Sequence, residues 1–173
     1  TRKRTGVLVA AIAGFLLAAA PLVALAAPAD LDPSFDGDGK VLAGSTGPAR
    51  SVALQGDGKI VAAGDCVVEL ATSFDFCLAR YDPDGSLDAT FGKDALVTTD
   101  FGASFDVPWA VAIQDDGRIV AAGECGPGAS AVFCLARYTT DGSLDTSFDG
   151  DGLVSTGGFT STGQDSAKAR ALL

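Results

Sequence analysis

The sequence predicts an all-β protein, a β-propeller-like repeat array with four-stranded antiparallel blades of about 57 residues. Three segments carry this prediction, because they align without gaps and begin 56 and 57 residues apart. They are LDPSFDGDGKV from Leu31, LDATFGKDALV from Leu87 and LDTSFDGDGLV from Leu144. In addition, a strand-like stretch occurs twice between them, and no segment after residue 26 has a helical period of useful length.

The repeated stretch predicts a β-hairpin in each copy. The pairs are GDGKIVAAGDC (56–66) with DFCLARY (75–81), and DDGRIVAAGEC (115–125) with VFCLARY (132–138). Each apolar run follows a turn signal of Asp and Gly, which is typical of a buried strand. Placing the two cysteines of each hairpin directly opposite one another sets Gly64 against Ala79 and Gly123 against Ala136. Both copies then share one register, although the second loop is two residues shorter.

The other strands are predicted from the turn residues around them. The first unit has four strands, at 40–43, 49–55, 59–66 and 76–81, and the second has four, at 95–101, 109–114, 118–125 and 133–138. The small residues Ala62, Ala63 and Gly64 predict that neighbouring blades approach closely. The phenylalanine of each LDxxF segment is expected to pack beneath the turn between blades; these residues are Phe35, Phe91 and Phe148.

The N-terminus has the layout of a secretory signal peptide over residues 1–26. Basic residues at 2–4 precede an apolar run that ends in the small-x-small sequence Ala24-Leu25-Ala26. An uncleaved membrane anchor is the alternative, since the run is just long enough to span a bilayer. The repeats then occupy 27–173, as units at about 31–86, 87–143 and a truncated 144–173. Because the last residues resemble the opening of another strand, we expect a fragment of a longer protein, with open edges that favour self-association.

Composition narrows the function classes. The formal net charge of −10 argues against a nucleic-acid partner, because phosphate contacts need Lys and Arg. No membrane contact is expected beyond the signal peptide. The sequence contains no histidine, which excludes Ser-His-Asp and Cys-His catalysis, and its 22 acidic residues single out no carboxylate pair. We therefore expect a non-catalytic protein, with a propeller-based extracytoplasmic hydrolase as an alternative.

The four cysteines predict two disulfides, Cys66–Cys77 and Cys125–Cys134, one within each hairpin. Together with the signal peptide, they indicate a secreted or cell-surface location. Four buried thiols are the alternative. Zinc is disfavoured, because cysteine separations of 11 and 9 residues differ from the spacing of zinc knuckles.

One candidate for a metal site is the turn that follows the first hairpin. Asp82, Asp84 and Asp88 alternate like the start of a calcium loop. The second copy has Thr139 in place of Asp82, and no glutamate follows at the position of the bidentate ligand. Hydrogen bonding within the turn is therefore our preferred interpretation. Calcium remains the alternative, and no other cofactor is expected.

Arg80 and Arg137 are candidates for anion binding, because each lies in the middle of a strand where a cation needs a partner. Our preferred interpretation pairs each with a turn aspartate, Asp57 or Asp88 for Arg80. Trp109, the only tryptophan, is a candidate for stacking on a sugar, with partly buried packing as the preferred interpretation. The expected partner is an unidentified protein or glycan.

The combination of LDPSFDGDGKV, VALQGDGKIVAAG and FCLARYDPDGSLDATFG resembles the delta-60 repeat of secreted bacterial proteins, a propeller-like domain of unknown function. The resemblance extends over 31–173 and implies an exported or surface-associated protein with several repeats. The cysteine pair in each hairpin departs from the usual pattern. We therefore expect an exported, non-catalytic β-repeat scaffold with a binding or structural role at or outside the cell surface. A calcium-stabilised extracellular module is the alternative.

Overall fold

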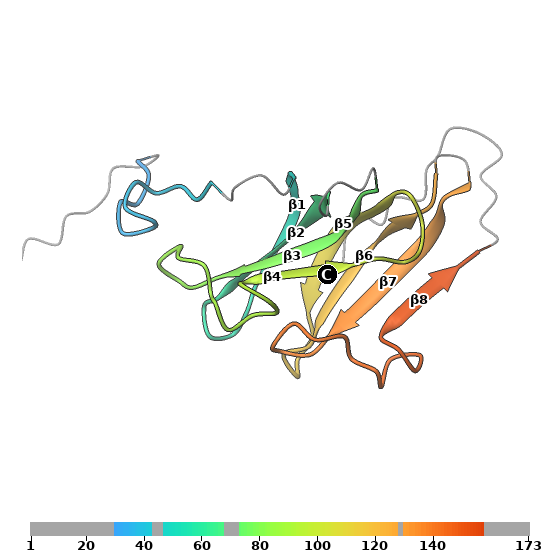
Figure 1. Ribbon diagram of the computed structural model, residues 1–173. Coiled ribbons are helices and arrows are strands. Elements are labelled where there is room, and N and C mark those ends of the chain that lie inside the picture. The colour runs from blue at the N-terminus through green and yellow to red at the C-terminus, as the bar shows by residue number, and fades with distance from the viewer. Residues whose placement is uncertain (1–29, 43–46, 68–72, 128–129, 158–173) are drawn as a thin grey trace, which may run out of the picture. The chain divides into compact units, whose positions relative to one another are not determined.

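The computed structural model describes residues 30–42, 47–67, 73–127 and 130–157, which contain two four-stranded sheets (Figure 1). The first sheet consists of β1 (Ala49–Leu54), β2 (Ile60–Cys66), β3 (Asp75–Tyr81) and β4 (Leu96–Thr99). The second consists of β5 (Asp106–Ile113), β6 (Ile119–Cys125), β7 (Val132–Tyr138) and β8 (Leu153–Thr156). Strands adjacent in sequence pair antiparallel in both sheets, which confirms the all-β prediction.

Both sheets lie in one compact unit, Leu31–Leu173, which is separate from Thr1–Asp30. The predicted signal peptide at 1–26 and the strand-like end of the chain at 166–173 lie outside the described residues. Within the described part of the chain, no helix has the length and apolar character needed to cross a membrane.

The fourth strand of each sheet comes from the next sequence repeat. β4 follows the LDATF segment of the second unit and pairs with β3 of the first, and β8 pairs with β7 in the same way. The prediction of a strand at 40–43 is therefore wrong for its described residues, because 40–42 are not in a strand. The strand at this position pairs with the hairpin of the preceding repeat, and no hairpin precedes it among the described residues.

The predicted hairpin register is wrong by two residues in both copies. Gly64 pairs with Cys77 rather than with Ala79, and Gly123 pairs with Cys134. The cysteines of each hairpin are therefore diagonal neighbours rather than directly opposed. A disulfide reaches such a pair, since the Cα atoms lie 5.8 Å and 6.0 Å apart. The prediction that both copies share one register is confirmed.

Each sheet presents two apolar faces, because side chains alternate along its strands. We name them the Phe face and the Tyr face after an aromatic residue on β3 and β7. The Phe face carries Val61, Ala63, Phe76 and Leu78 in the first sheet, and Val120, Ala122, Phe133 and Leu135 in the second. The Tyr face carries Val52, Leu54, Ile60, Ala62 and Tyr81 in the first sheet, and Val111, Ile113, Ile119, Ala121 and Tyr138 in the second.

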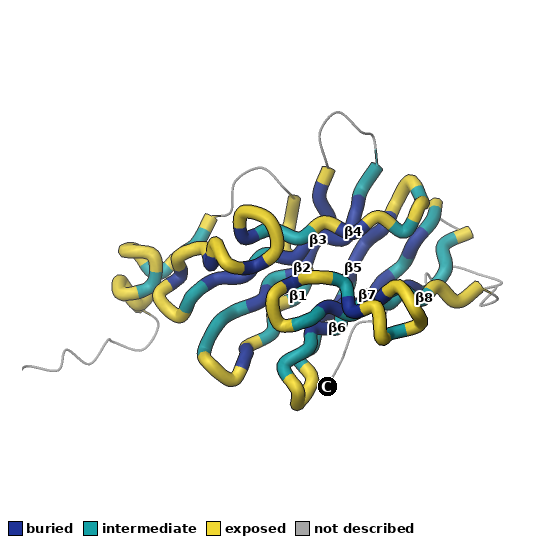
Figure 2. The backbone as a smooth tube through the Cα atoms, turned by 60° about the horizontal axis from the view of Figure 1, so that its bottom comes forward, coloured by how far each residue is buried: buried dark blue, intermediate teal, exposed yellow. Residues whose placement is uncertain are grey.

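The core forms where the Phe face of the first sheet packs on the Tyr face of the second. Buried residues follow the strands and exposed ones gather in the turns (Figure 2). A hydrogen bond crosses this core between the Thr99 hydroxyl and the Tyr138 hydroxyl, with the oxygens 2.8 Å apart. Phe91 is buried in the same core, as predicted, whereas Phe35 and Phe148 are half-buried. The two sheets therefore stack with unlike faces in contact.

Gly64 and Gly123 allow the first strand of each sheet to approach the second. A Cβ atom at these positions would collide with the carbonyl oxygens of Pro48 and Val107, beside the β-bulges in β1 and β5. The prediction that Gly64 lets neighbouring blades approach is therefore wrong, because the close contact lies within its own sheet. Ala63, in contrast, does lie in the core between the sheets.

We expect the Gly123→Ala substitution to lower the free energy of unfolding by about 1–3 kcal/mol, because the added methyl must displace backbone rather than a flexible side chain. Urea denaturation measures this loss. Gly56→Ala is the control, since a Cβ there meets no atom within 4 Å. Equal stability of the two variants would contradict the explanation.

Candidate functional site

A cluster of charged residues lies at one end of the first sheet, where β3 leads into the LDxxF turn. The Arg80 Nε atom donates to Asp88 Oδ2 over 2.7 Å, and Lys59 Nζ reaches the same oxygen over 2.9 Å. The other Asp88 oxygen accepts hydrogen bonds from the amide and hydroxyl of Thr90. The Arg80 guanidinium also lies over the Phe91 ring, 4.6 Å from its centroid. Asp88 thus neutralises two cations and shapes the turn.

The second sheet repeats this cluster. Arg137 Nε donates to Asp145 Oδ2 over 2.8 Å, and Arg118 Nε forms an ion pair with the same oxygen at 2.8 Å. Ser147 replaces threonine in the turn. Arg137 lies over the Phe148 ring, 4.5 Å from its centroid. We call this arrangement the cation–Asp–Arg–Phe cluster. It comprises Lys59, Asp88, Arg80 and Phe91 in the first copy, and Arg118, Asp145, Arg137 and Phe148 in the second.

The two arginines proposed as anion contacts are therefore occupied within the protein. Arg80 pairs with Asp88, one of the two predicted partners, whereas Asp57 accepts a hydrogen bond from the amide of Lys59. Arg80 also donates to the backbone carbonyl of Thr140, in the turn that follows β7 of the second sheet. The cluster thus links the two sheets.

Hydrogen bonds lower the pKa of both shared aspartates. The Thr90 hydroxyl, followed by Lys59, holds the pKa of Asp88 well below its usual range. The Ser147 hydroxyl is the largest cause of the lowered pKa of Asp145, which is about 2. Both carboxylates are therefore ionised at neutral pH, as ion pairs with arginine require.

The three predicted calcium candidates make contacts within the protein. Asp84 accepts hydrogen bonds from the amide and hydroxyl of Ser86, and Asp82 pairs with Lys59. Asp88 belongs to the cluster described above. These contacts engage one carboxylate oxygen of Asp82, one of Asp84 and both of Asp88, and they are those expected of turn chemistry.

Trp109 lies on β5, half-buried beneath the guanidinium of Arg50, which is 4.4 Å from the centre of the tryptophan ring. Arg50 itself pairs with Asp65 on β2. The contact joins the first strands of the two sheets, since Arg50 belongs to β1. One face of the indole is therefore covered by a cation–π contact rather than open to a sugar.

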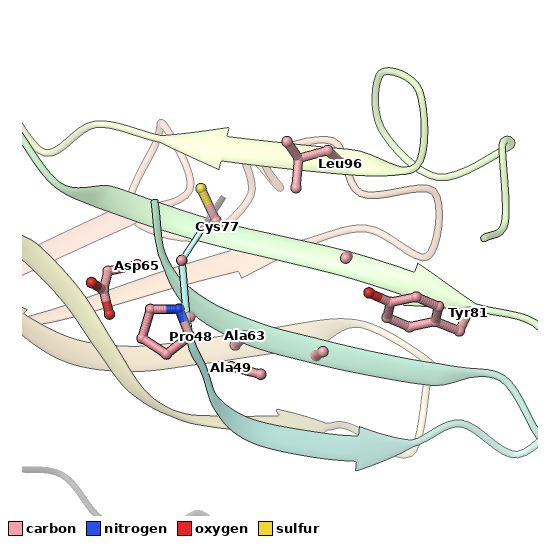
Figure 3. Close-up of a pocket in the computed structure, with 11 residues that line it drawn as sticks. Pro48, Ala49, Ala63, Asp65, Cys77, Tyr81 and Leu96 are labelled. Atoms are coloured by element: carbon pink, nitrogen blue, oxygen red, sulfur yellow. The ribbon is translucent and has the colours of Figure 1, made fainter. Parts of the chain in front are cut away.

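Two hollows in the described part of the chain lie along the Tyr face of the first sheet. A small one of about 50 Å³ extends along β1, β2 and β3, with Tyr81 at one end and Pro48, Asp65 and Cys77 at the other (Figure 3). A larger one of about 460 Å³ lies between this face and the segment 35–42. Its lining is largely apolar and contains Val52, Ile60 and Ala62. It offers apolar area but few polar groups that would orient a small ligand.

A group of three aspartates, which the sequence did not indicate, lies between the two sheets. Asp75 begins β3, Asp100 follows β4 and Asp106 begins β5. Carboxylate oxygens of the three lie within 4.8 Å of one another. The group does not recur, since the aligned positions in the other copy hold Val132, Gly157 and Gly47. A comparison of the two copies could have found these aspartates, because each is replaced by a residue without a carboxylate in the other copy.

Two segments of the chain are similar to a known family. Residues 55–91 and 114–148 match a family model described as a domain of unknown function (DUF5122), beta-propeller. Each matched segment contains all four members of one cation–Asp–Arg–Phe cluster. No curated protein matched the chain. The two sheets are thus propeller-like blades, and we use this word for them below.

Proposed function

We propose that the chain is an exported, non-catalytic scaffold of the delta-60 kind, whose blades stack on further blades at or outside the cell surface. The observation that carries the proposal is that the three charged residues of each cation–Asp–Arg–Phe cluster recur in both blades and pair with one another. A residue that pairs within every blade supports the fold rather than a reaction. The two cysteine pairs at disulfide distance are compatible with export.

The stacking function is supported by the exposure of equivalent residues in the two blades. Val52 is 66% exposed and Leu54 69% exposed on the Tyr face of the first blade. Their equivalents Val111 and Ile113 are buried and half-buried, because the first blade covers the Tyr face of the second. The first blade therefore leaves Val52 and Leu54 exposed at positions whose equivalents are covered in its neighbour.

The Phe faces of the two blades differ in the opposite direction, because the first blade buries its Phe face more completely than the second. Phe76 and Leu78 are fully buried on the Phe face of the first blade, whereas their equivalents Phe133 and Leu135 are only partly buried on the second. The partly exposed Phe face of one chain therefore matches the exposed part of the Tyr face of another. We propose a second copy of this chain as the occupant, stacked head to tail by the contact that already joins its two blades.

We expect Val52→Lys to weaken this self-association, because it places a charge where an apolar side chain must be buried. Burial of one such side chain contributes about 1.5–3 kcal/mol, so the dissociation constant should rise by at least about tenfold. Sedimentation equilibrium of the full chain over a range of concentrations measures the change.

Ala89→Lys is the matched control, since Ala89 is exposed in the turn before Phe91 and belongs to neither face. The control should associate like the wild-type chain. A wild-type chain that stays monomeric at every concentration, or an equal loss in both variants, would contradict stacking through the Tyr face.

A further inference from the structure

The three aspartates between the blades come from separate segments that other contacts hold together. The amide of Asp106 donates to the carbonyl of Phe74 over 2.7 Å, next to the start of β3. The rings of Phe74 and Phe105 stack with their centroids 5.4 Å apart. Asp106 Oδ2 accepts the amide of Phe101, 2.8 Å away, just after Asp100. The end of the first blade and the start of the second are thus fixed around the carboxylates.

Two of the three carboxylates are buried, and each has an oxygen without a partner. Asp106 is 0% exposed and Asp75 is 8% exposed. The Oδ1 atoms of both are buried and accept no hydrogen bond. Among the described residues, no lysine or arginine forms an ion pair with any of the three aspartates. Burial of a carboxylate without a compensating charge costs free energy of folding. A positively charged group between these carboxylates would offset that cost.

The electrostatics of the group agree with the geometry. Burial, followed by the charge of Asp100, raises the pKa of Asp75. Burial is also the largest cause of the raised pKa of Asp106, and the charges of Asp100 and Asp75 add to it. The charge of Asp100 therefore makes ionisation of Asp75 and Asp106 harder, and a bound cation would reverse this effect.

We propose that Asp75, Asp100 and Asp106 bind a divalent cation of the calcium type, which holds the two blades together. Carboxylate oxygens are the ligands that hard cations prefer, whereas zinc prefers nitrogen and sulfur. Calcium accepts irregular sets of protein oxygens from several segments, whereas magnesium keeps most of its water and demands octahedral geometry. This site differs from the turn at Asp82, Asp84 and Asp88, whose carboxylates have partners within the protein.

Calorimetry and thermal unfolding of the full chain, stripped with EDTA and titrated with calcium chloride, test the site. We expect one calcium ion per chain. The melting temperature should rise by about 5 °C at a tenfold excess over the dissociation constant. Magnesium chloride at the same concentrations should have a smaller effect. An equal rise with magnesium would overturn the assignment to calcium.

Substitutions should separate this site from the turn. Asp100→Asn changes an exposed residue, so the variant should fold, and it should weaken calcium binding by at least about tenfold. Asp106→Asn should weaken it further, yet should raise the melting temperature in EDTA, because it removes a buried charge. Asp84→Asn is the control and should bind calcium like the wild-type chain. Absence of calcium binding to the wild-type chain, unchanged binding by Asp100→Asn, or a loss in Asp84→Asn alone would overturn the proposal.

Discussion

Replacing Asp88 with alanine is expected to lower the free energy of unfolding by about 3–5 kcal/mol, because it leaves a buried arginine without its counter-charge. The Arg80 side chain is only 8% exposed and the Asp88 side chain 4% exposed. Lys59 loses a partner at the same time, and the turn loses the two hydrogen bonds from Thr90. Urea denaturation, followed by circular dichroism, measures the loss.

The second blade supplies a graded comparison for this experiment. Asp145→Ala breaks the equivalent pair, but the Arg137 side chain is 20% exposed and can be hydrated. We therefore expect a smaller loss, of about 1–2 kcal/mol. Asp84→Ala, in an exposed turn, should cost less than either. If Asp88→Ala cost no more than Asp84→Ala, the cluster would not be a structural element of the blade.

The same cluster makes stability depend on acid. The pKa of Asp88 and of Asp145 is lower in the folded chain than in the unfolded chain, so folding favours the ionised form. This contribution is fully present above the unfolded value of about 3.9. It is lost as the pH falls from about 4 towards 2, where Asp145 itself becomes protonated. Asp88→Ala should flatten that part of the pH profile.

The strands and the cluster could be predicted because they recur in the sequence. Ile60–Cys66 and Ile119–Cys125 are short apolar runs bounded by Asp and Gly, and both form strands within one residue of the predicted start. The sequence predicted Asp57 or Asp88 as the partner of Arg80, because a cation in the middle of a strand requires a nearby carboxylate, and one of the two is the observed partner. Choosing Asp88 over Asp57 needed the geometry of the turn that returns to the end of β3.

The hairpin register could not be derived from the cysteines, because a slip of two residues leaves every side chain on the same face. Both the predicted and the observed pairing of Gly64 place Ala62 and Tyr81 together on the Tyr face. The cysteines remain close enough for a disulfide in the observed register, so their identity does not decide between the two. The register depends on which backbone groups of the two strands form hydrogen bonds with each other. The residue types alone do not determine that choice.

The group of three aspartates was not predicted from the sequence, because its members do not recur in the other copy. Asp75 and Asp106 are 31 residues apart and belong to different blades. Only the stacking of the blades brings their carboxylates together. The strongest signals in the sequence are the residues that the two copies share, whereas this candidate site lies where the copies differ. In a repeat protein, shared polar residues serve the fold first, and polar residues unique to one copy are better candidates for binding.

Replacing both cysteines of the second hairpin, Cys125→Ala with Cys134→Ala, should cost about 3–5 kcal/mol. Loops of this length contribute about 3 kcal/mol in the chain-entropy model, because cross-linking restricts the unfolded chain. These cysteines also belong to the core between the blades, so truncation removes packing as well. Thermal unfolding under non-reducing conditions measures the loss.

The first hairpin provides the matched comparison, because Cys66 and Cys77 close a loop of similar length but face the open Tyr face rather than the core between the blades. Cys66→Ala with Cys77→Ala should therefore cost the chain-entropy contribution of about 3 kcal/mol and some packing within the first blade, because both side chains are buried, but no packing between the blades. A reductant should reach this pair first, since a hollow beside Cys77 opens to solvent. Wild-type stability in both double variants would show that the cysteines are thiols. Equal losses would show that the core between the blades adds nothing to the second disulfide, and that the blades stack more loosely than their buried faces indicate.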